Sequence, residues 1–165
     1  MSDAVVLDTS FLISLADRNR GCHGAAKAYN KYFLDKKIVM LLPTVVAAEF
    51  ALKQPITDLP LRNFRVLPFN LTEAQRCADL NVTYFRKATG LVGQRDAVKD
   101  DFKIIAQTVE QQAGFLITED EETLAKYYDL LKAEGKLRFA VIPLKQGFDE
   151  SRANENGQCG LPMDI

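Results

Sequence analysis

Short apolar runs alternate with longer segments of helical periodicity along almost the whole chain, and this alternation restricts the fold more than any other feature. Short apolar runs are typical of buried strands, whereas apolar side chains three and four residues apart indicate helices. Strands separated by helices predict right-handed βαβ units, and hence an α/β fold with a mainly parallel central sheet. The sheet is expected to hold about five strands: Ala4–Leu7, Ile38–Leu42, Arg65–Phe69, Phe115–Thr118 and Arg138–Pro143.

The helices expected between and after these strands are Thr9–Ala16, His23–Leu34, Thr44–Lys53, Thr72–Lys87, Val98–Gln112 and Glu121–Lys132. The clearest of them precedes Gly114, because Phe102, Ile105 and Val109 form an apolar stripe along it.

The length of 165 residues suits one domain, because a chain of about 150 residues buries roughly 68–70% of its unfolded surface. We expect residues 1–145 to form this domain and the polar residues 146–165 to form a C-terminal extension. No apolar run approaches the ~20 residues that span a bilayer. The first residues lack the basic start and cleavage site of a signal peptide. We therefore expect no membrane association and a cytoplasmic location.

The ionisable residues argue against several classes of site. A net charge of −1 does not suit a protein coated in positive charge for non-specific nucleic-acid binding. Three scattered cysteines (Cys22, Cys77 and Cys159) and one histidine do not supply the four ligands of a structural zinc site. Cys22 precedes His23, but an adjacent pair without a third partner does not establish a reactive thiolate.

Acidic residues stand where the expected strands end. In open α/β sheets, ligands bind beyond the carboxyl ends of the strands. The first strand runs into Asp8, the second leads to a helix that bears Glu49, and the fourth runs into Asp120. A helix follows Asp8 and another follows Asp120, so capping of these helices is the alternative interpretation of both aspartates.

Two helical carboxylates are singled out by their surroundings. Glu49 is the one polar residue of the segment VVAAEFAL, and burying a carboxylate without a partner is costly. A metal ion or a shared proton would compensate, whereas a position at an exposed edge would avoid the cost. Farther along the chain, a rotation of about 100° per helical residue places Asp101 beside the apolar stripe and Asp100 away from it. We therefore expect Asp101 to face a cleft and Asp100 to face solvent.

Carboxylates that converge repel one another unless a cation neutralises them. Acidic sites rich in oxygen select hard cations such as Mg²⁺ or Mn²⁺. Such an ion can lower the pKa of bound water, polarise a phosphodiester and stabilise the departing oxyanion. The residues expected to hold it are Asp8, Glu49, Asp101 and Asp120.

Four ordered motifs resemble those of PIN-domain nucleases. VVLDTSFLISL resembles their opening motif, and PTVVAAEF resembles the second, with its glutamate. DDFKIIAQTVEQQAGFLITEDEETL resembles the third and fourth, in the pattern D-x-x-I-x-A followed by an apolar strand and T-x-D. The similarity spans roughly Ala4 to Pro143. It implies a PIN-like, three-layer α/β/α fold and metal-dependent cleavage of RNA.

The resemblance also implies roles for particular residues. Three aspartates, Asp8, Asp101 and Asp120, would hold the metals. Glu49 would bind the metal or its ligands and help to position the water. The hydroxyl of Thr9 or Ser10, and that of Thr118, would orient the carboxylates or bind the scissile phosphate.

Many bacterial relatives of this kind are VapC-like toxins that pair with a small antitoxin and are often dimeric. An antitoxin partner and a homodimer are therefore implied here. The longer middle connection and the polar C-terminal extension depart from the short toxins. These departures bear on toxin status more than on nuclease chemistry.

Basic residues around the loop before Asp101 are candidates for contact with RNA phosphates, with an ordinary solvated surface as the alternative. They are Arg86, Lys87, Arg95, Lys99 and Lys103.

Two other functions compete with the nuclease. An aspartate-nucleophile phosphatase would carry a second aspartate two residues after Asp8, where this chain has Ser10. A non-catalytic binding module would use the same carboxylates only to cap helices.

Overall fold

The computed structural model describes residues 2–80, 95–122 and 124–154 and contains one five-stranded sheet. All strand pairs in it are parallel, in the order β3-β2-β1-β4-β5, so the expected α/β class and the mainly parallel sheet are confirmed. The strands are β1 (Ser2–Leu7), β2 (Val39–Pro43), β3 (Phe64–Leu67), β4 (Ala113–Thr118) and β5 (Ala140–Pro143).

The first strand occupies the centre of the sheet. It pairs with β2 on one side and β4 on the other, with Val6 opposite Leu41 and Leu116. Val5, Val6 and Leu7 are fully buried, as expected for a strand covered on both faces. Because Asp8 follows this strand directly, its backbone lies at the middle of the sheet's carboxyl edge.

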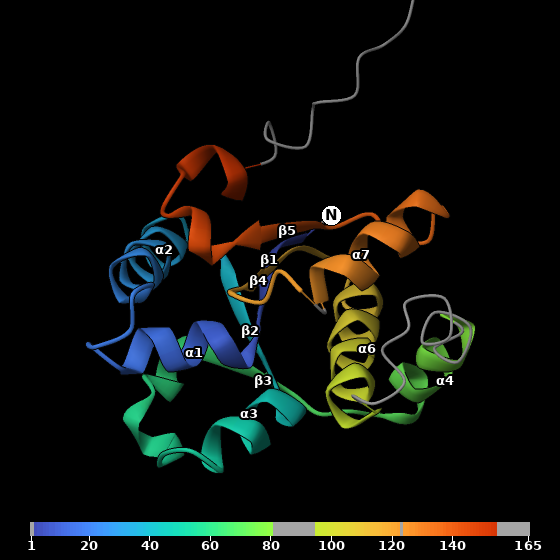
Figure 1. The fold of residues 1–165 in the computed structure, drawn as a ribbon, viewed down its shortest axis with the longest axis horizontal. Coiled ribbons are helices and arrows are strands. Elements are labelled where there is room, and N and C mark those ends of the chain that lie inside the picture. The colour runs from blue at the N-terminus through green and yellow to red at the C-terminus, as the bar shows by residue number, and fades with distance from the viewer. Residues whose placement is uncertain (1, 81–94, 123, 155–165) are drawn as a thin grey trace, which may run out of the picture.

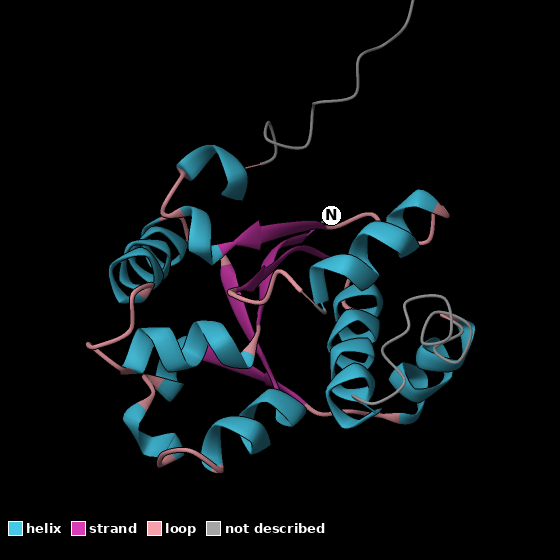
Figure 2. Ribbon diagram, viewed as in Figure 1, coloured by secondary structure: helices cyan, strands magenta, loops and turns pink. Residues whose placement is uncertain are grey.

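Helices cover both faces of the sheet and produce three layers (Figures 1 and 2). They are α1 (Thr9–Ala16), α2 (His23–Asp35), α3 (Thr44–Ala51), α4 (Leu71–Asp79), α6 (Arg95–Glu110) and α7 (Leu124–Ala133). In Figure 1, α1 and α2 lie on one side of the sheet, and α4, α6 and α7 lie on the other. Helix α3 contacts both α1 and α6, so it joins the two helical layers.

The expected helices agree with the structure except near their ends. The helix expected at Thr72–Lys87 begins at Leu71 and ends at Asp79, and residues 81–94 lie outside the described part of the chain. The last helix begins at Leu124 rather than Glu121. The delay has a local cause, because residues 118–122 form a turn that is held by its own side-chain hydrogen bonds.

The third strand ends early, at Leu67, one residue before Pro68. A side chain of α6 contacts the carbonyl groups at this point. The buried side chain of Gln107 has its amide nitrogen 3.3 Å from the carbonyl oxygens of Leu67 and of Pro68. This contact anchors α6 to the edge of the sheet, which helps to set the position of Asp100 and Asp101 at the other end of that helix.

Residues 147–153 pack against α2. The ring centroids of Phe148 and Tyr29 lie 4.9 Å apart in an edge-on arrangement. The Tyr29 hydroxyl accepts a hydrogen bond from the backbone N–H of Asp149 at 3.1 Å and donates to a carbonyl oxygen of the same segment. The start of the polar extension is thus in contact with the body of the domain. Within the described residues, no helix has the length and apolar character required to cross a membrane.

Replacing Tyr29 with Phe should weaken the attachment of this segment. The substitution keeps the ring contact but removes the acceptor of the partly buried Asp149 N–H, and the loss of one such hydrogen bond typically costs about 0.5–1.5 kcal/mol. Urea denaturation should show a lower free energy of unfolding by that amount. Tyr32→Phe is the matched control, because its ring also lies near Phe148 (6.0 Å) but its hydroxyl makes no hydrogen bond to any described residue. Equal stabilities of the two variants would contradict this role of the Tyr29 hydroxyl.

Candidate active site

The carboxyl ends of β1 and β4 lie side by side. The backbone N–H of Asp8 donates to the carbonyl oxygen of Ile117 at 3.1 Å, which extends the pairing of the two strands. Asp8 then begins the turn into α1, and Thr118 ends β4. The sheet therefore brings together two side chains that are 110 positions apart in sequence.

The Asp8 carboxylate is buried and is held by hydroxyl groups. Ser10 Oγ donates to its Oδ2 atom at 2.6 Å, and Thr118 Oγ1 donates to the same atom at 2.7 Å. Asp8 occupies the N-cap position of α1, yet its side chain makes no capping hydrogen bond. Burial raises the pKa of Asp8, and the two hydroxyl hydrogen bonds offset this effect only in part. The hydroxyl groups are thus the main partners of this carboxylate, and the backbone N–H groups of Thr9 and Ser10 contribute less, so capping of α1 alone does not account for it.

The Glu49 side chain comes from α3 and is half-buried. Thr9 Oγ1, at the start of α1, donates a hydrogen bond to its Oε2 atom. Burial raises the pKa of Glu49, and the nearby carboxylates of Asp100 and Asp8 raise it further. Two other acidic side chains are therefore close enough to Glu49 to influence its charge.

Both aspartates at the start of α6 lie near this group. Asp101 lines the same pocket as Asp8 and Glu49, in agreement with its expected orientation. The expectation that Asp100 faces solvent is wrong, because its side chain is only 28% exposed and lies close enough to Glu49 to raise that residue's pKa. The expectation considered only which side of the helix faces the sheet. In the structure α3 also packs against α6, so a residue that points away from the sheet can still be covered. Lys103 pairs with Asp100 at 2.9 Å.

A pocket of about 390 Å³ joins these side chains. The residues that line it are Asp8, Thr9, Ser10, Ile13, Arg20, Glu49, Leu52, Lys53, Asp101 and Asp120. All four carboxylates singled out in the sequence are thus brought to one hollow, together with two of the three hydroxyl residues. The third hydroxyl residue, Thr118, is buried beneath the Asp8 carboxylate.

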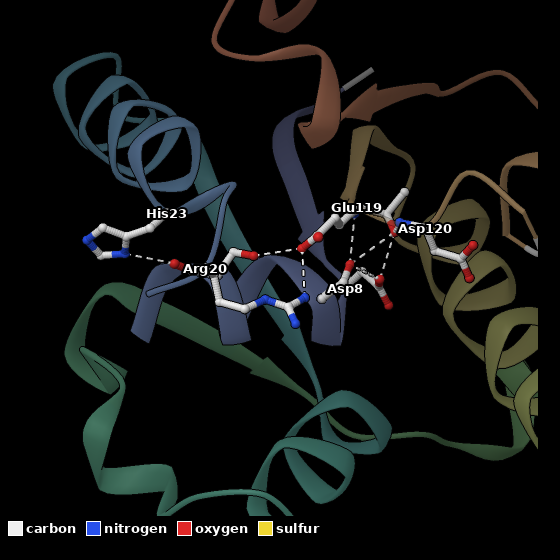
Figure 3. A network of polar contacts seen from close by, with 8 residues as sticks. Asp8, Arg20, His23, Glu119 and Asp120 are labelled. Carbon is white, nitrogen blue, oxygen red and sulfur yellow. Dashed lines mark hydrogen bonds and ion pairs between the residues drawn. The ribbon is translucent and has the colours of Figure 1, made fainter. Parts of the chain in front are cut away.

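The Asp120 carboxylate combines a structural contact with a place in the pocket. Its backbone N–H donates to Thr118 Oγ1 at 2.9 Å, and its Oδ1 atom accepts from the backbone N–H of Glu122 at 2.8 Å. Asp120 therefore stabilises the turn before α7, which begins only at Leu124, instead of capping that helix, and it also lines the pocket. In Figure 3 the Asp120 side chain extends from the neighbourhood of Asp8 toward α6, the helix that bears Asp101.

Two basic side chains of the pocket, Arg20 and Lys53, were not singled out in the sequence. Both follow a helix without a recognisable motif, so no local signal could have found them. Of the five residues proposed to contact RNA, Lys103 is described and pairs with Asp100. The remaining proposals lie outside what the structure describes: residues 86 and 87 entirely, and the side chains of Arg95 and Lys99.

A second network of polar contacts adjoins the pocket (Figure 3). The Oε2 atom of Glu119 accepts from Ser14 Oγ at 2.7 Å and from Arg20 Nη2 at 3.0 Å. Its backbone N–H donates to Ser10 Oγ at 2.8 Å. Burial raises the pKa of Glu119, but the hydrogen bonds from Ser14 and Arg20 and the positive charge of Arg20 outweigh burial and keep that pKa below its usual value. Glu119 therefore remains an anion at neutral pH.

The adjacent pair Cys22 and His23 does not form a reactive centre. Burial and the charge of Glu119 raise the pKa of the Cys22 thiol, which disfavours the thiolate. His23 Nδ1 donates to the carbonyl oxygen of Ser14 at 2.9 Å, so this side of the ring serves the network around Glu119.

The donor set of the pocket suits a hard divalent cation, because it consists of carboxylate and hydroxyl oxygens with no sulfur or imidazole among them. The same side chains are not arranged as a finished ligand set. Within the described residues, no three Asp, Glu, His or Cys side chains are gathered closely enough to hold a metal ion.

Comparisons with known proteins show which fold this is. No protein-family model matches the chain, and no curated protein matches it in sequence. Several solved structures are similar in fold, and two of them illustrate the likeness. One is the VapBC2 complex of Rickettsia felis, bound to a DNA fragment from its promoter, in which the matching chain is 13% identical with a TM-score of 0.56. The match covers 85% of this chain and 98% of that one.

The other is VapC20 of Mycobacterium tuberculosis, described as a toxin that cleaves the sarcin–ricin loop. It is 14% identical with a TM-score of 0.50, and the match covers 74% of this chain and 94% of that one. At such identities the likeness concerns the fold alone. The PIN-like fold implied by the sequence motifs is thereby confirmed.

The pKa of Asp8 generates a prediction about stability. Because the folded-state pKa lies above the unfolded value of 3.8, stability is greatest below that value and is lost as pH rises through the folded-state pKa. Asp8→Asn cannot ionise but keeps an oxygen for Ser10 and Thr118. In EDTA at neutral pH, its midpoint of thermal unfolding should therefore exceed that of the wild type by a few degrees, and the difference should shrink as pH falls toward 3.8.

Asp3→Asn provides the control for this comparison, because Asp3 is exposed on the same strand and its replacement should change the midpoint little. A midpoint of Asp8→Asn below that of the wild type at neutral pH would show that ionised Asp8 stabilises the fold.

Proposed function

We propose that this protein is a metal-dependent endoribonuclease that hydrolyses RNA phosphodiester bonds in the acidic pocket. The observation that carries the proposal is the meeting of Asp8, Glu49, Asp101 and Asp120 in one hollow. These residues come from four separate parts of the chain. The fold adds support, because it is shared with two structures of the VapC kind, one of which is described as a toxin that cleaves the sarcin–ricin loop.

In this proposal, Asp8, Asp101 and Asp120 hold Mg²⁺ or Mn²⁺. An ion of this kind, when bound, supplies an activated water and stabilises the oxyanion that departs from phosphorus. The Asp8 carboxylate keeps one orientation, because Ser10 and Thr118 both donate to the same oxygen.

Glu49 is the proposed acceptor of the proton from the attacking water. Its raised pKa, caused by burial and then by neighbouring negative charge, makes it a better base than an exposed glutamate. The hydrogen bond from Thr9 orients the Glu49 carboxylate toward the start of α1. Lys103, which pairs with Asp100 beside the pocket, remains a proposed RNA contact together with Arg95 and Lys99.

We further propose that the protein is the toxin of a toxin–antitoxin pair, with a small protein antitoxin as partner and a homodimer as the active assembly. The shared fold supports this, since one similar structure is a VapBC complex. A domain of residues 1–145 with a C-terminal extension of residues 146–165 remains the proposed organisation.

Purified protein should cleave single-stranded or structured RNA with Mg²⁺ or Mn²⁺, and EDTA should stop the reaction. Asp120→Asn should lower the rate by about a hundredfold or more, the scale on which misplaced catalytic groups act. Glu121→Gln is the matched control: it removes a neighbouring, exposed charge that does not line the pocket, so its rate should be unchanged. Gel electrophoresis of end-labelled RNA measures both rates.

An equal loss of cleavage rate in the two variants, or cleavage that persists in EDTA, would contradict the proposed nuclease function. Binding of Mn²⁺ without any cleavage of RNA would instead favour the non-catalytic binding module.

The toxin proposal predicts growth arrest when the chain is expressed in bacteria without its partner. Asp8→Asn should relieve the arrest, because the variant lacks a proposed metal ligand but keeps the fold. Growth curves after induction, with protein levels matched by immunoblot, test this outcome. Normal growth with the wild-type protein at equal levels would argue against toxin status and leave the nuclease proposal to the cleavage assay.

A further inference from the structure

A pocket lined by carboxylates cannot bind a polyanion such as RNA through those groups alone. The basic side chains that line it are Arg20 and Lys53. Lys53 is exposed, and its side chain makes no ion pair with any described residue. Arg20 differs from it, because Glu119 holds the guanidinium at 3.0 Å. The pocket thus contains one basic group whose position is set by the fold.

The anchor of Arg20 is itself held at several points. The Glu119 carboxylate accepts a hydrogen bond from Ser14 Oγ at 2.7 Å, and the backbone N–H of Glu119 donates to Ser10 Oγ at 2.8 Å. Ser14 is fully buried, and its carbonyl oxygen accepts from the His23 ring at 2.9 Å. Figure 3 shows the guanidinium of Arg20 beneath Glu119, on the side of Asp8. Arg20 therefore rests on a rigid support shared by α1, β4 and the loop before α2.

Glu119 cannot serve as a further metal ligand in this arrangement. Its Oε2 atom is committed to Ser14 and Arg20, and its side chain does not line the pocket. Its neighbour Asp120 does line the pocket. The two adjacent carboxylates thus have different roles, and Glu119 acts through the Arg20 guanidinium that it holds.

The contact with Glu119 leaves most of the guanidinium available. It uses one terminal nitrogen, whereas a guanidinium carries five N–H donors that match the geometry of phosphate oxygens. The Arg20 side chain is 40% exposed, so a ligand in the pocket can reach it.

We infer that Arg20 binds a phosphate of the RNA substrate beside the acidic pocket and that Glu119 is its positioning residue. This inference rests on the proposed ribonuclease function and assigns one of its phosphate contacts. A guanidinium held in place loses little side-chain freedom on binding, which favours tight and oriented contact with the backbone of the substrate. Since a phosphate contact carries no base information, Arg20 contributes affinity and register rather than sequence preference.

The test is equilibrium binding of a fluorescent single-stranded RNA to proteins that carry Asp8→Asn, so that cleavage does not interfere. Adding Arg20→Ala should weaken binding roughly tenfold or more, as expected for a lost hydrogen bond between charged groups. The slope of log affinity against log salt should become shallower by about 0.7, the value for one phosphate contact with a single strand. Arg20→Lys should keep the slope and lose less affinity.

Arg18→Ala is the matched control. Arg18 is an exposed arginine of the same loop, but it lines a different hollow, beside α2. Its loss removes the same charge and should change neither affinity nor slope. Glu119→Gln tests the positioning role, because Arg20 keeps its charge but loses its ionic anchor. Its affinity should fall severalfold with the salt slope retained.

Equal binding by the Arg20→Ala and Arg18→Ala proteins would overturn the inference, provided that the parent with Asp8 intact cleaves RNA. Failure of the proposed function would look different. In that case the protein with Asp8 intact would not cleave RNA, and the Asp8→Asn protein would not bind it. That result would overturn both. Circular dichroism and thermal unfolding of each variant establish that the fold is kept, and Arg20→Lys provides the comparison should Arg20→Ala unfold.

Discussion

The burial of the Asp8 carboxylate at the end of the central strand is the constraint on which the rest of the site depends. Val5, Val6 and Leu7 lead directly to it, and their complete burial leaves it little access to water. Two hydroxyls compensate in part, one from α1 and one from the end of β4. Because these two residues are 108 positions apart in the sequence, the orientation of this carboxylate requires the assembled sheet. A site of this kind exists only in the folded protein.

Charge is divided between two neighbouring networks. In the pocket, burial raises the pKa of Asp8 and of Glu49, and the carboxylates of Asp100 and Asp8 add to the effect on Glu49. Beside it, Glu119 is neutralised by Arg20 and has a lowered pKa. Ser10 connects the two, since its hydroxyl donates to Asp8 and accepts from the backbone of Glu119. The first network suits a metal ion, and the second presents the positively charged Arg20 guanidinium. Together they provide what is required to bring a metal ion and a phosphodiester together.

Local signals in the sequence were sufficient for the elements and for choosing the four acidic residues as candidates. Asp8 and Asp120 follow apolar strands, whereas Glu49 and Asp101 stand among or beside apolar residues of a helix. The strand order was not predictable in this way, since pairing of β1 with both β2 and β4 depends on the whole chain. Asp100 was misplaced because the packing of α3 on α6 was unknown. Arg20 was missed because its partner, Glu119, lies 99 positions away, and the docking of Phe148 on Tyr29 spans a similar separation.

The claim that these distant carboxylates form a single cation site is tested most directly by paramagnetic broadening with Mn²⁺. In heteronuclear NMR spectra, the amide signals of residues 8, 49, 101 and 120 should broaden together at the same low Mn²⁺ concentration and recover when EDTA is added. Mg²⁺ in excess should prevent the effect. Broadening of these signals at clearly different concentrations, or first at the exposed residues Glu121 and Glu122, would contradict a shared site.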